Sequence, residues 1–316
     1  MKCFVTGAGG FAGSALRRLL DEQGHQVSGG VFSRTRPGPG NLVACDLLDY
    51  GALADLLGKS QPDVVFHLAA QSSPSQSWRQ PLQFFENNVQ GTVHLLEAVR
   101  IRCPQARVLL VSSSQIYAAP LAGQKLKEDS PLDSPNPYAC SKRMAEMAAE
   151  QYWKSFAVRV IIARPFNHSG PGQSESFVIS DFCRQAAMLE RQAGRQGESV
   201  IRVGSLAPVR DFLDVRDAVR AYLLLALKGE EGQAYNVCSG KGNAIQAILD
   251  AVLSQLRVKI AVRHEAARQR KRDHPCLVGD NTKLRQVGSW LPQIPLQQTI
   301  RETLEYWRCS EKGAVS

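Results

Sequence analysis

The sequence of 316 residues has no run of about 18 uncharged apolar residues, the length that a helix needs to cross a bilayer. Its N-terminus passes from Met1 and Lys2 directly into a short apolar segment, without the apolar core of a signal peptide. We therefore expect a soluble, cytoplasmic protein with no membrane partner.

The sequence also lacks cysteine pairs at metal-ligand spacing. The eight cysteines are scattered singly, with no C-x-x-C motif and no cluster of cysteine and histidine. This pattern argues against a disulfide framework and against a zinc site. We predict that the protein holds no metal and that most of its thiols are reduced and buried.

No concentrated nucleic-acid-binding segment is present, although the formal net charge is +9. Basic residues are spread along the chain except at Arg268–Arg272, and aromatic and basic residues do not alternate. The charge therefore favours a site for a small molecule that carries a diphosphate, and we predict no nucleic-acid partner.

What the sequence does contain is an alternation of apolar strands and helices. This order predicts an α/β fold, a doubly wound parallel sheet whose ligands bind beyond the carboxyl ends of the strands. The expected strands are 2–6, 26–32, 42–44, 63–67, 107–112 and 158–163, and the helices include 50–57 and 82–102. The residues just past these strands are candidates for the ligand site: Asp46, Leu47, Leu68, Ala69, Ala70, Ser72, Ser113, Ser114 and Gln115.

Glycines follow the first strand at intervals of three. Gly7 permits a tight turn, Gly10 lets a phosphate approach the backbone, and Gly13 lets the next helix lie close to the strand. A pyrophosphate can then bind at the helix N-terminus, at Phe11 and Ala12. We predict a dinucleotide site here; the alternative is a glycine-rich turn without a ligand.

The second strand ends in Ser33-Arg-Thr-Arg36, where an NAD site usually carries an acidic residue for the ribose 2′-hydroxyl. Arg34 or Arg36 could bind a 2′-phosphate instead, so we predict NADP(H) in preference to NAD(H). The alternative is that both arginines are solvated in a loop.

Tyr138 and Lys142 lie four residues apart at the start of a predicted helix and therefore share one face. A free tyrosine has a pKa of about 10, and a nearby positive charge favours its phenolate. The pair suits proton transfer, although the same spacing fits a helix with one stacked tyrosine and one solvated lysine.

The regular alternation loosens after the polar segment 164–173, which is rich in glycine and proline. We predict a dinucleotide-binding domain at 1–164, to which 207–238 returns. A smaller C-terminal α/β substrate lobe is expected from 165–206 and 239–308, and a disordered tail at 309–316.

The chain resembles the extended short-chain dehydrogenase/reductases that act on nucleotide sugars. The resemblance rests on the glycine turn, Ser113, Tyr138 and Lys142 in this order, and on landmarks that include His67–Ala70, Asn88–Gly91, Arg164–Asn167 and Arg210–Arg216. It covers nearly the whole chain and implies a Rossmann domain with a substrate lobe. It also implies that Ser113, Tyr138 and Lys142 are catalytic and that Asn88 and Pro165 contact the cofactor.

The second half is most similar to the branch that contains GDP-mannose 4,6-dehydratases and GDP-4-keto-6-deoxymannose reductases. A dehydratase of this branch is expected to carry a carboxylate two residues after its active-site serine or threonine. This chain has Gln115 there, and an amide cannot accept a proton near neutral pH. The resemblance therefore implies NADPH-dependent reduction of the C4 ketone to GDP-D-rhamnose or its C4 epimer, unless Glu128 or Asp129 supplies the acid.

In such a reduction Tyr138 would protonate the developing alkoxide and Ser113 would donate a hydrogen bond to the same oxygen. Lys142 would bind the nicotinamide ribose and lower the pKa of Tyr138. Which of Arg268, Arg270 and Arg272 grips the diphosphate stays open. The implied substrate-binding residues are Ser72, Ser114, Gln115, Asn167, Arg210, Arg270 and Asp273.

Three alternatives remain: a GDP-mannose 4,6-dehydratase, a nucleotide-sugar 4-epimerase that retains NAD, and a regulatory module that keeps the dinucleotide fold without catalysis. The predicted helices 82–102 and 138–156 carry apolar stripes beyond what one sheet face requires. Related enzymes pair through such helices in a four-helix contact, which implies a homodimer.

Overall fold

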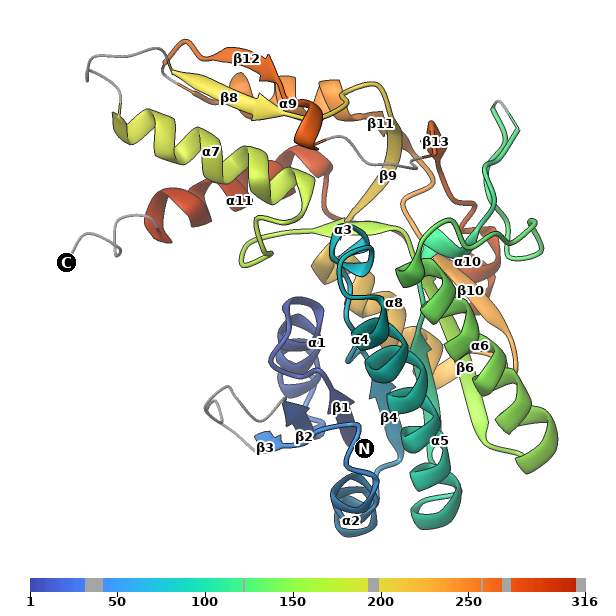
Figure 1. The fold of residues 1–316 in the computed structure, drawn as a ribbon. Coiled ribbons are helices and arrows are strands. Elements are labelled where there is room, and N and C mark those ends of the chain that lie inside the picture. Colours follow the sequence, from blue (N-terminus) through green and yellow to red (C-terminus); the bar gives the residue numbers. More distant parts are fainter. Residues whose placement is uncertain (32–41, 122, 193–198, 257, 269–273, 311–316) are drawn as a thin grey trace.

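A large parallel sheet organises the chain in a computed structural model that describes residues 1–31, 42–121, 123–192, 199–256, 258–268 and 274–310. Its strand order is β10-β6-β5-β4-β1-β2-β3 (Figure 1). The strands are β1 (Lys2–Thr6), β2 (Gln26–Val31), β3 (Leu42–Ala44), β4 (Val64–His67), β5 (Arg107–Val111), β6 (Arg159–Pro165) and β10 (Ala234–Val237). The strand order reverses direction between β1 and β4, so ligands are expected beyond the carboxyl ends of these two strands.

Helices cover both faces of this sheet. One buried cluster joins it to α1 (Phe11–Glu22), α8 (Val215–Lys228) and α10 (Thr282–Gly288). The cluster on the other face includes residues of α2 (Tyr50–Ser60), α5 (Gly91–Arg102) and α6 (Pro137–Phe156).

The middle strand β5 shows why its sequence is continuously apolar. Leu109 packs in the α1/α8 cluster, whereas Val108 and Leu110 pack in the α2/α5/α6 cluster. A strand that is buried on both faces cannot alternate apolar and polar residues. The predicted doubly wound α/β fold is confirmed.

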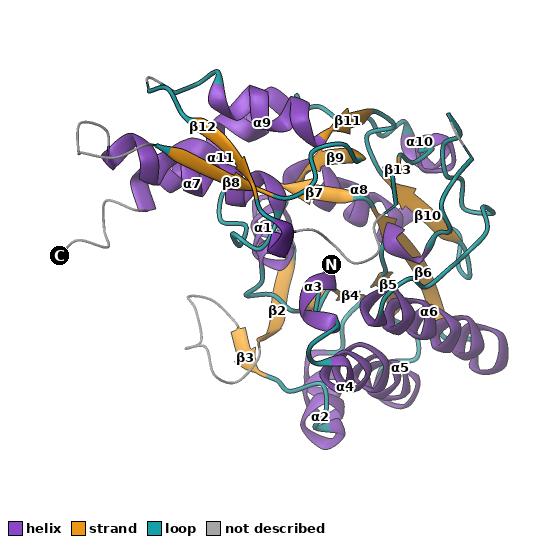
Figure 2. Ribbon diagram, turned by 45° about the horizontal axis from the view of Figure 1, so that its top comes forward, coloured by secondary structure: helices purple, strands orange, loops and turns teal. Residues whose placement is uncertain are grey.

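A second lobe lies above the carboxyl ends of the large sheet in Figure 1. Strand β9 (Val209–Asp214) pairs there with β7 (Asn167–Ser169), β11 (Gly242–Ala244) and β13 (Cys276–Leu277). The remainder of the lobe consists of α7 (Val178–Gln192), β8 (Val200–Val203), α9 (Ile245–Leu253), β12 (Ala261–His264), η3 (Ala266–Arg268) and α11 (Leu296–Ser310) (Figure 2).

The predicted helix 82–102 is interrupted. The structure has α4 (Pro81–Phe85), a π-helical turn η1 (Glu86–Gln90) and then α5, preceded by the short α3 (Pro74–Ser77). A π turn adds one residue to a turn and leaves the apolar spacing on either side almost unchanged, so the pattern does not reveal it.

Two predicted boundaries also differ. Within 207–238, α8 and β10 pack on or within the large sheet, whereas β9 joins the smaller one. Helix α11 extends through Cys309 to Ser310, because its apolar side packs against α7, and so the predicted tail does not begin at Cys309. The remaining tail residues, 311–316, and Phe32 lie outside the described residues.

In the part of the chain that the structure describes, none of the helices combines the length and the apolar character needed to span a membrane.

Candidate active site

The turn after β1 requires glycine at two positions. Gly7 has φ of +70°, and a Cβ there would lie 2.9 Å from the backbone N and Cα of Ala69. A Cβ on Gly13 would lie 2.0 Å from the carbonyl O of Gly7. The start of α1 can therefore lie against β1 and the segment after β4 only because side chains are missing.

Helix α1 begins without a capping side chain. Its N-cap is Gly10, which accepts from the N–H of Ser14 through its backbone carbonyl and makes no side-chain cap. The N–H groups of the first turn, at Phe11, Ala12 and Gly13, form the kind of N-terminus that binds phosphate. This backbone cradle fits a dinucleotide diphosphate.

A chain of hydrogen bonds around His67 holds the segment after β4. The N–H of Ala69 donates to Thr6 Oγ1 (3.1 Å), and Thr6 Oγ1 is 2.8 Å from His67 Nδ1. The Thr92 hydroxyl donates to the carbonyl of Asn88 and lies 3.0 Å from His67 Nε2. His67 is therefore protonated on Nε2 alone, and burial together with the charge of Lys142 lowers its pKa to about 3.

Asn88, predicted to contact the cofactor, is buried and its amide is occupied by the protein. Its Oδ1 accepts from the N–H of Gln71 (2.7 Å), and its Nδ2 donates to the Gln71 carbonyl and to Ser141 Oγ. Asn88 thus links the segment after β4 to α6. In this structure it positions the site rather than offering a free amide to a ligand.

Tyr138 lies at the first turn of α6, which Asn136 caps by accepting from the N–H of Ala139. The Tyr138 side chain is 7% exposed and meets Phe84 edge to face. Burial raises the pKa of Tyr138, and a hydrogen bond with Ser113 lowers it in part. Tyr138 is therefore protonated at neutral pH, the form that a proton donor needs.

Lys142 is predicted to lower the pKa of Tyr138, and its surroundings in the structure are as follows. Its Nζ donates to the carbonyl of Val111 (2.7 Å), at the end of β5. Burial lowers the pKa of Lys142 to about 8, and the charge of Glu146 opposes this decrease. The pKa of Tyr138 is raised and not lowered, because desolvation of its phenol outweighs the favourable contact with Ser113.

Gln115 lies in a short 3-10 turn, η2 (Ser114–Ile116), directly after β5. Ser113 caps the turn, and its Oγ accepts from the N–H of Gln115 (3.2 Å). The turn therefore fixes Ser113 and Gln115 relative to each other.

The two alternative acids lie elsewhere. Glu128 Oε1 accepts from the N–H of Asn236 on β10 (2.8 Å), and burial raises the pKa of Glu128. Asp129 is exposed in the loop between η2 and α6. Glu128 is therefore bound to the sheet edge rather than directed to the η2 turn.

The predicted substrate residues on β7 and β9 are held by the protein. Asn167 Nδ2 donates to the carbonyl of Asp211 (3.1 Å). Arg210 is buried, and its guanidinium donates to the carbonyls of Val209 and His274. Contact between Arg210 and a diphosphate would require some of these bonds to be exchanged.

Sequence reasoning missed Asp211 and His168. Asp211 accepts hydrogen bonds from Ser239, Gly240 and Gly279 and so joins three segments of the second lobe; burial nevertheless raises its pKa to about 6. His168 stacks on Phe11, the first residue of α1. The only signal for His168 was a polar residue directly after Asn167.

The other predicted ligand residues surround the carboxyl edge of the large sheet to different depths. Asp46 accepts from the N–H of Leu48, and Leu47 is buried against Gly91. Partly exposed positions are Leu68, Ala69 and Ala70; Ser72 is exposed; Ser114 and Pro165 are buried. The predictions for Arg34, Arg36, Arg270 and Asp273 fall outside the described residues.

Arg268 has protein partners. Its guanidinium lies 2.7 Å from Asp181 on α7 and 3.3 Å from Glu265. Contact between Arg268 and a diphosphate would therefore compete with these two carboxylates.

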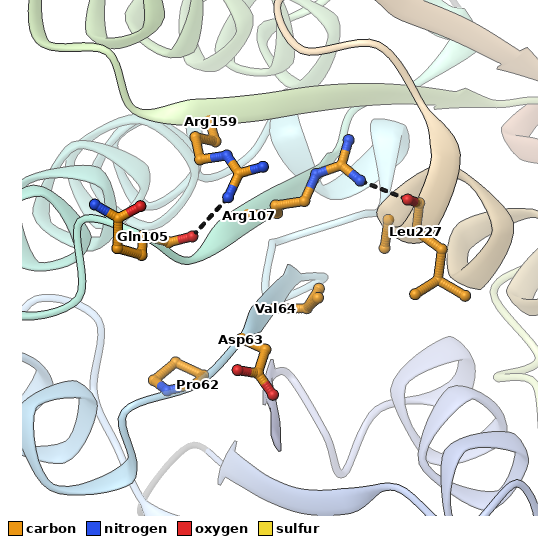
Figure 3. A pocket seen from close by; sticks show the side chains of 8 residues that line it. Pro62, Asp63, Val64, Gln105, Arg107, Arg159 and Leu227 are labelled. Carbon is orange, nitrogen blue, oxygen red and sulfur yellow. Dashed lines mark hydrogen bonds between the residues drawn. The ribbon is translucent and has the colours of Figure 1, made fainter. Parts of the chain in front are cut away.

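A cavity of about 270 Å³ lies at the opposite edge of the large sheet (Figure 3). It is lined at the amino ends of three strands by Asp63, Val64, Arg107 and Arg159, and by Leu227 at the end of α8. Arg107 donates to the carbonyl of Leu227 and Arg159 to that of Gln105, so both arginines satisfy backbone groups. The candidate catalytic side chains are not among its lining residues.

No group of three or more histidine, cysteine, aspartate or glutamate residues is arranged to hold a metal ion in the described ranges.

Comparison with known proteins agrees with the fold. The family model described as GDP-mannose 4,6 dehydratase matches residues 4–303. The chain is 34% identical over 309 residues to GDP-6-deoxy-D-mannose reductase of Pseudomonas aeruginosa, covering 97% of each protein. It is 29% identical to UDP-glucose 4-epimerase of Mycolicibacterium smegmatis, over 98% of this chain and 99% of the epimerase.

Among solved structures, that of RMD from Pseudomonas aeruginosa complexed with NADPH is similar, with a TM-score of 0.85 and 32% identity. The similarity covers 98% of this chain and 99% of the other.

Proposed function

The chain belongs to the GDP-mannose 4,6-dehydratase family, and we propose that it is an NADPH-dependent reductase of GDP-4-keto-6-deoxy-D-mannose. Its product would be GDP-D-rhamnose or the C4 epimer. The observation that carries this proposal is Gln115, an amide at the position where a dehydratase needs a base. The likeness to GDP-6-deoxy-D-mannose reductase and to a structure complexed with NADPH supports the substrate and the cofactor.

The arrangement of Ser113, Tyr138 and Lys142 supports ketone reduction. NADPH, when bound, supplies the hydride. Tyr138 is protonated at neutral pH and would give its proton to the oxygen at C4, and Ser113 would donate a hydrogen bond to the same oxygen. The ammonium of Lys142, fixed at the end of β5, would hold the nicotinamide ribose.

The glycine cradle at Gly7, Gly10 and Gly13 would hold the cofactor diphosphate, with the N–H groups of Phe11 and Ala12 directed to it. The segment Leu68–Ala70 would lie against the dinucleotide, because Ala69 contacts the position of Gly7. We assign the second lobe to the nucleotide sugar, with Asn167 and Arg210 as its nearest described candidates.

A direct assay tests this function. GDP-4-keto-6-deoxy-D-mannose, generated by a dehydratase, is mixed with the protein and NADPH, and the absorbance of NADPH is followed. Oxidation with formation of a GDP-6-deoxyhexose, identified by NMR, is the expected result. The absence of NADPH oxidation in protein that binds NADPH would overturn the proposed substrate.

Two other functions give different results in the same experiment. A dehydratase would convert GDP-mannose itself and release water. A 4-epimerase, the activity of the Mycolicibacterium smegmatis relative, would be purified with bound NAD and would interconvert two sugars without net NADPH consumption. The non-catalytic module would be favoured if Tyr138→Phe left a cellular phenotype untouched while nucleotide binding persisted.

We also propose a homodimer formed through α4, α5 and α6. The exposed apolar residues on or beside these helices are Trp78, Leu82, Ile101, Met144, Met147 and Phe156. Apolar side chains on adjacent helices form the kind of patch that a second copy can cover. Sedimentation at micromolar concentration should show a dimer, and Met147→Glu combined with Leu82→Glu should give a folded monomer. A wild-type monomer would contradict this proposal.

A further inference from the structure

Glu146 lies one helical turn after Lys142 and is fully buried. Its two carboxylate oxygens accept from Arg164 on β6, with Nε–Oε1 at 3.0 Å and Nη2–Oε2 at 2.8 Å. Both groups are charged and inaccessible to water, so neither can lose its partner without leaving a buried charge unpaired.

The third nitrogen of Arg164 reaches a different part of the site. Its Nη1 donates to the hydroxyl of Tyr117 (3.0 Å) and to the carbonyl of Glu128 (2.8 Å). Tyr117 directly follows the η2 turn, is fully buried, and donates to Asn236 Oδ1 on β10 (2.7 Å). One guanidinium therefore connects the catalytic helix to the end of the turn that carries Ser113 and Gln115.

Among the described groups that face Lys142, Glu146 is the one that carries a charge. Tyr138, on the same helix, is neutral, and His67, from β4, is neutral as well. Val111 contributes only a carbonyl from β5. Arg164 carries the opposite charge behind Glu146. Glu146 is thus the carboxylate that offsets the burial of the Lys142 ammonium.

Resting on the proposed function, we propose that Glu146 and Arg164 are positioning residues of the active site. Glu146 supplies the negative charge that Lys142 faces, and Arg164 joins α6 to the end of the η2 turn. The pair acts through Lys142 and Ser113 and does not touch the substrate.

The electrostatic half of the proposal, the charge of Glu146 beside Lys142, predicts a specific change of NADPH affinity with pH. NADPH affinity of the wild type should be constant at low pH and fall as pH rises through about 8, where Lys142 loses its proton. Glu146→Gln leaves Arg164 unopposed beside Lys142, so the midpoint should move down by about one pH unit, which is roughly a fivefold weaker affinity at pH 8 because the protonated fraction of Lys142 falls from about one half to about one tenth. Fluorescence titration of NADPH between pH 6 and 9 measures this without any substrate.

Matched variants separate charge from folding. Glu146→Asp keeps the charge and should keep the midpoint. The double variant Glu146→Gln with Arg164→Gln removes both charges and should return the midpoint toward that of the wild type. Arg143→Gln removes a partly exposed cation that also lies near Glu146, at 3.4 Å, and should change little.

The mechanical half of the proposal, the link from Arg164 to the η2 turn, predicts that kcat changes while NADPH binding does not. Tyr117→Phe removes the link between Arg164 and the η2 turn and leaves the Glu146–Arg164 pair intact. It should lower kcat at least fivefold with an unchanged Kd for NADPH and an unchanged midpoint.

The outcomes are distinguishable. A wild type that binds NADPH with a pH dependence but does not reduce the ketone defeats the proposed substrate and leaves the inference standing on the binding data. Identical midpoints for the wild type and a folded Glu146→Gln variant overturn the electrostatic half. An unchanged kcat in Tyr117→Phe overturns the mechanical half.

Discussion

The imidazole of His168 stacks on the ring of Phe11, with centroids 6.1 Å apart and planes 3° from parallel. His168 belongs to β7 of the second lobe, and Phe11 is the first residue of α1. The contact therefore joins the proposed substrate lobe to the N-terminus that would hold the cofactor diphosphate. Gly170, two residues later, also approaches the ring of Phe11.

Removal of this stack should affect the cofactor more than the chemical step. An aromatic pair contributes about 0.5–1.5 kcal/mol beyond area burial, so His168→Leu should raise the KM for NADPH roughly two- to tenfold, with a smaller change in kcat. Steady-state kinetics at saturating ketone measure both constants. His168→Phe retains the stack and serves as the control; an equal loss in both variants would assign the effect to the imidazole nitrogens instead.

Tyr138→Phe removes the hydroxyl that interacts with Ser113 and should abolish proton donation. The buried ring is kept, so the fold should not be disturbed. We expect kcat to fall by about 10²–10⁴-fold, the usual contribution of a general acid, with NADPH affinity unchanged. Ser113→Ala removes the interaction that lowers the pKa of Tyr138 and should give a smaller loss. Retention of most of the activity in Tyr138→Phe would show that another group supplies the proton.

Gln115→Glu should introduce a base at the position where the related dehydratases are expected to carry one. In D₂O, the wild type should catalyse no exchange at C5 of the 4-keto sugar, whereas Gln115→Glu should catalyse measurable exchange, followed by NMR against an enzyme-free blank. Exchange catalysed by the wild type would indicate a base other than residue 115 and would favour dehydration chemistry.

Tyr222 on α8 should tolerate loss of its hydroxyl. That group is fully buried and has no hydrogen-bond partner among the described residues, and an unsatisfied buried polar group costs about 1–3 kcal/mol. Tyr222→Phe should therefore raise the free energy of unfolding by about 1 kcal/mol in urea denaturation. Tyr117→Phe, which loses two hydrogen bonds, should lower it, and equal destabilisation by both variants would mean that Tyr222 has a partner, such as a buried water.

Much of the fold followed from the sequence because each element carries its own local signal. The glycine spacing after β1, the doubly buried apolar runs and Asn136-Pro137 at the start of α6 specify turns, strands and a helix start within a few residues. The two boundaries that failed depend on contacts made far along the chain. Cys309 is helical because α11 packs on α7. β9 pairs with β7 in the smaller sheet and not with a strand of the large sheet.

The chemistry of individual side chains was harder to predict for the same reason. Spacing placed Tyr138 and Lys142 on one face, but the direction of the tyrosine pKa depends on burial, which the sequence does not state. The sequence also gave no sign that Gln71 and Ser141 would occupy the amide of Asn88. The Glu146–Arg164 pair joins residues of two elements whose adjacency exists only after folding.

The position of β10 beside β6 has a consequence for synthesis of the chain. β10 forms the edge of the large sheet and follows β7, α7, β8 and β9 of the second lobe in sequence (Figure 1). While the chain emerges from the ribosome, the edge of β6 and the face that α8 covers stay unprotected until β10 and α8 appear. Such an exposed strand edge favours aggregation, and nascent chains of this protein truncated before Ala234 should therefore depend on chaperones.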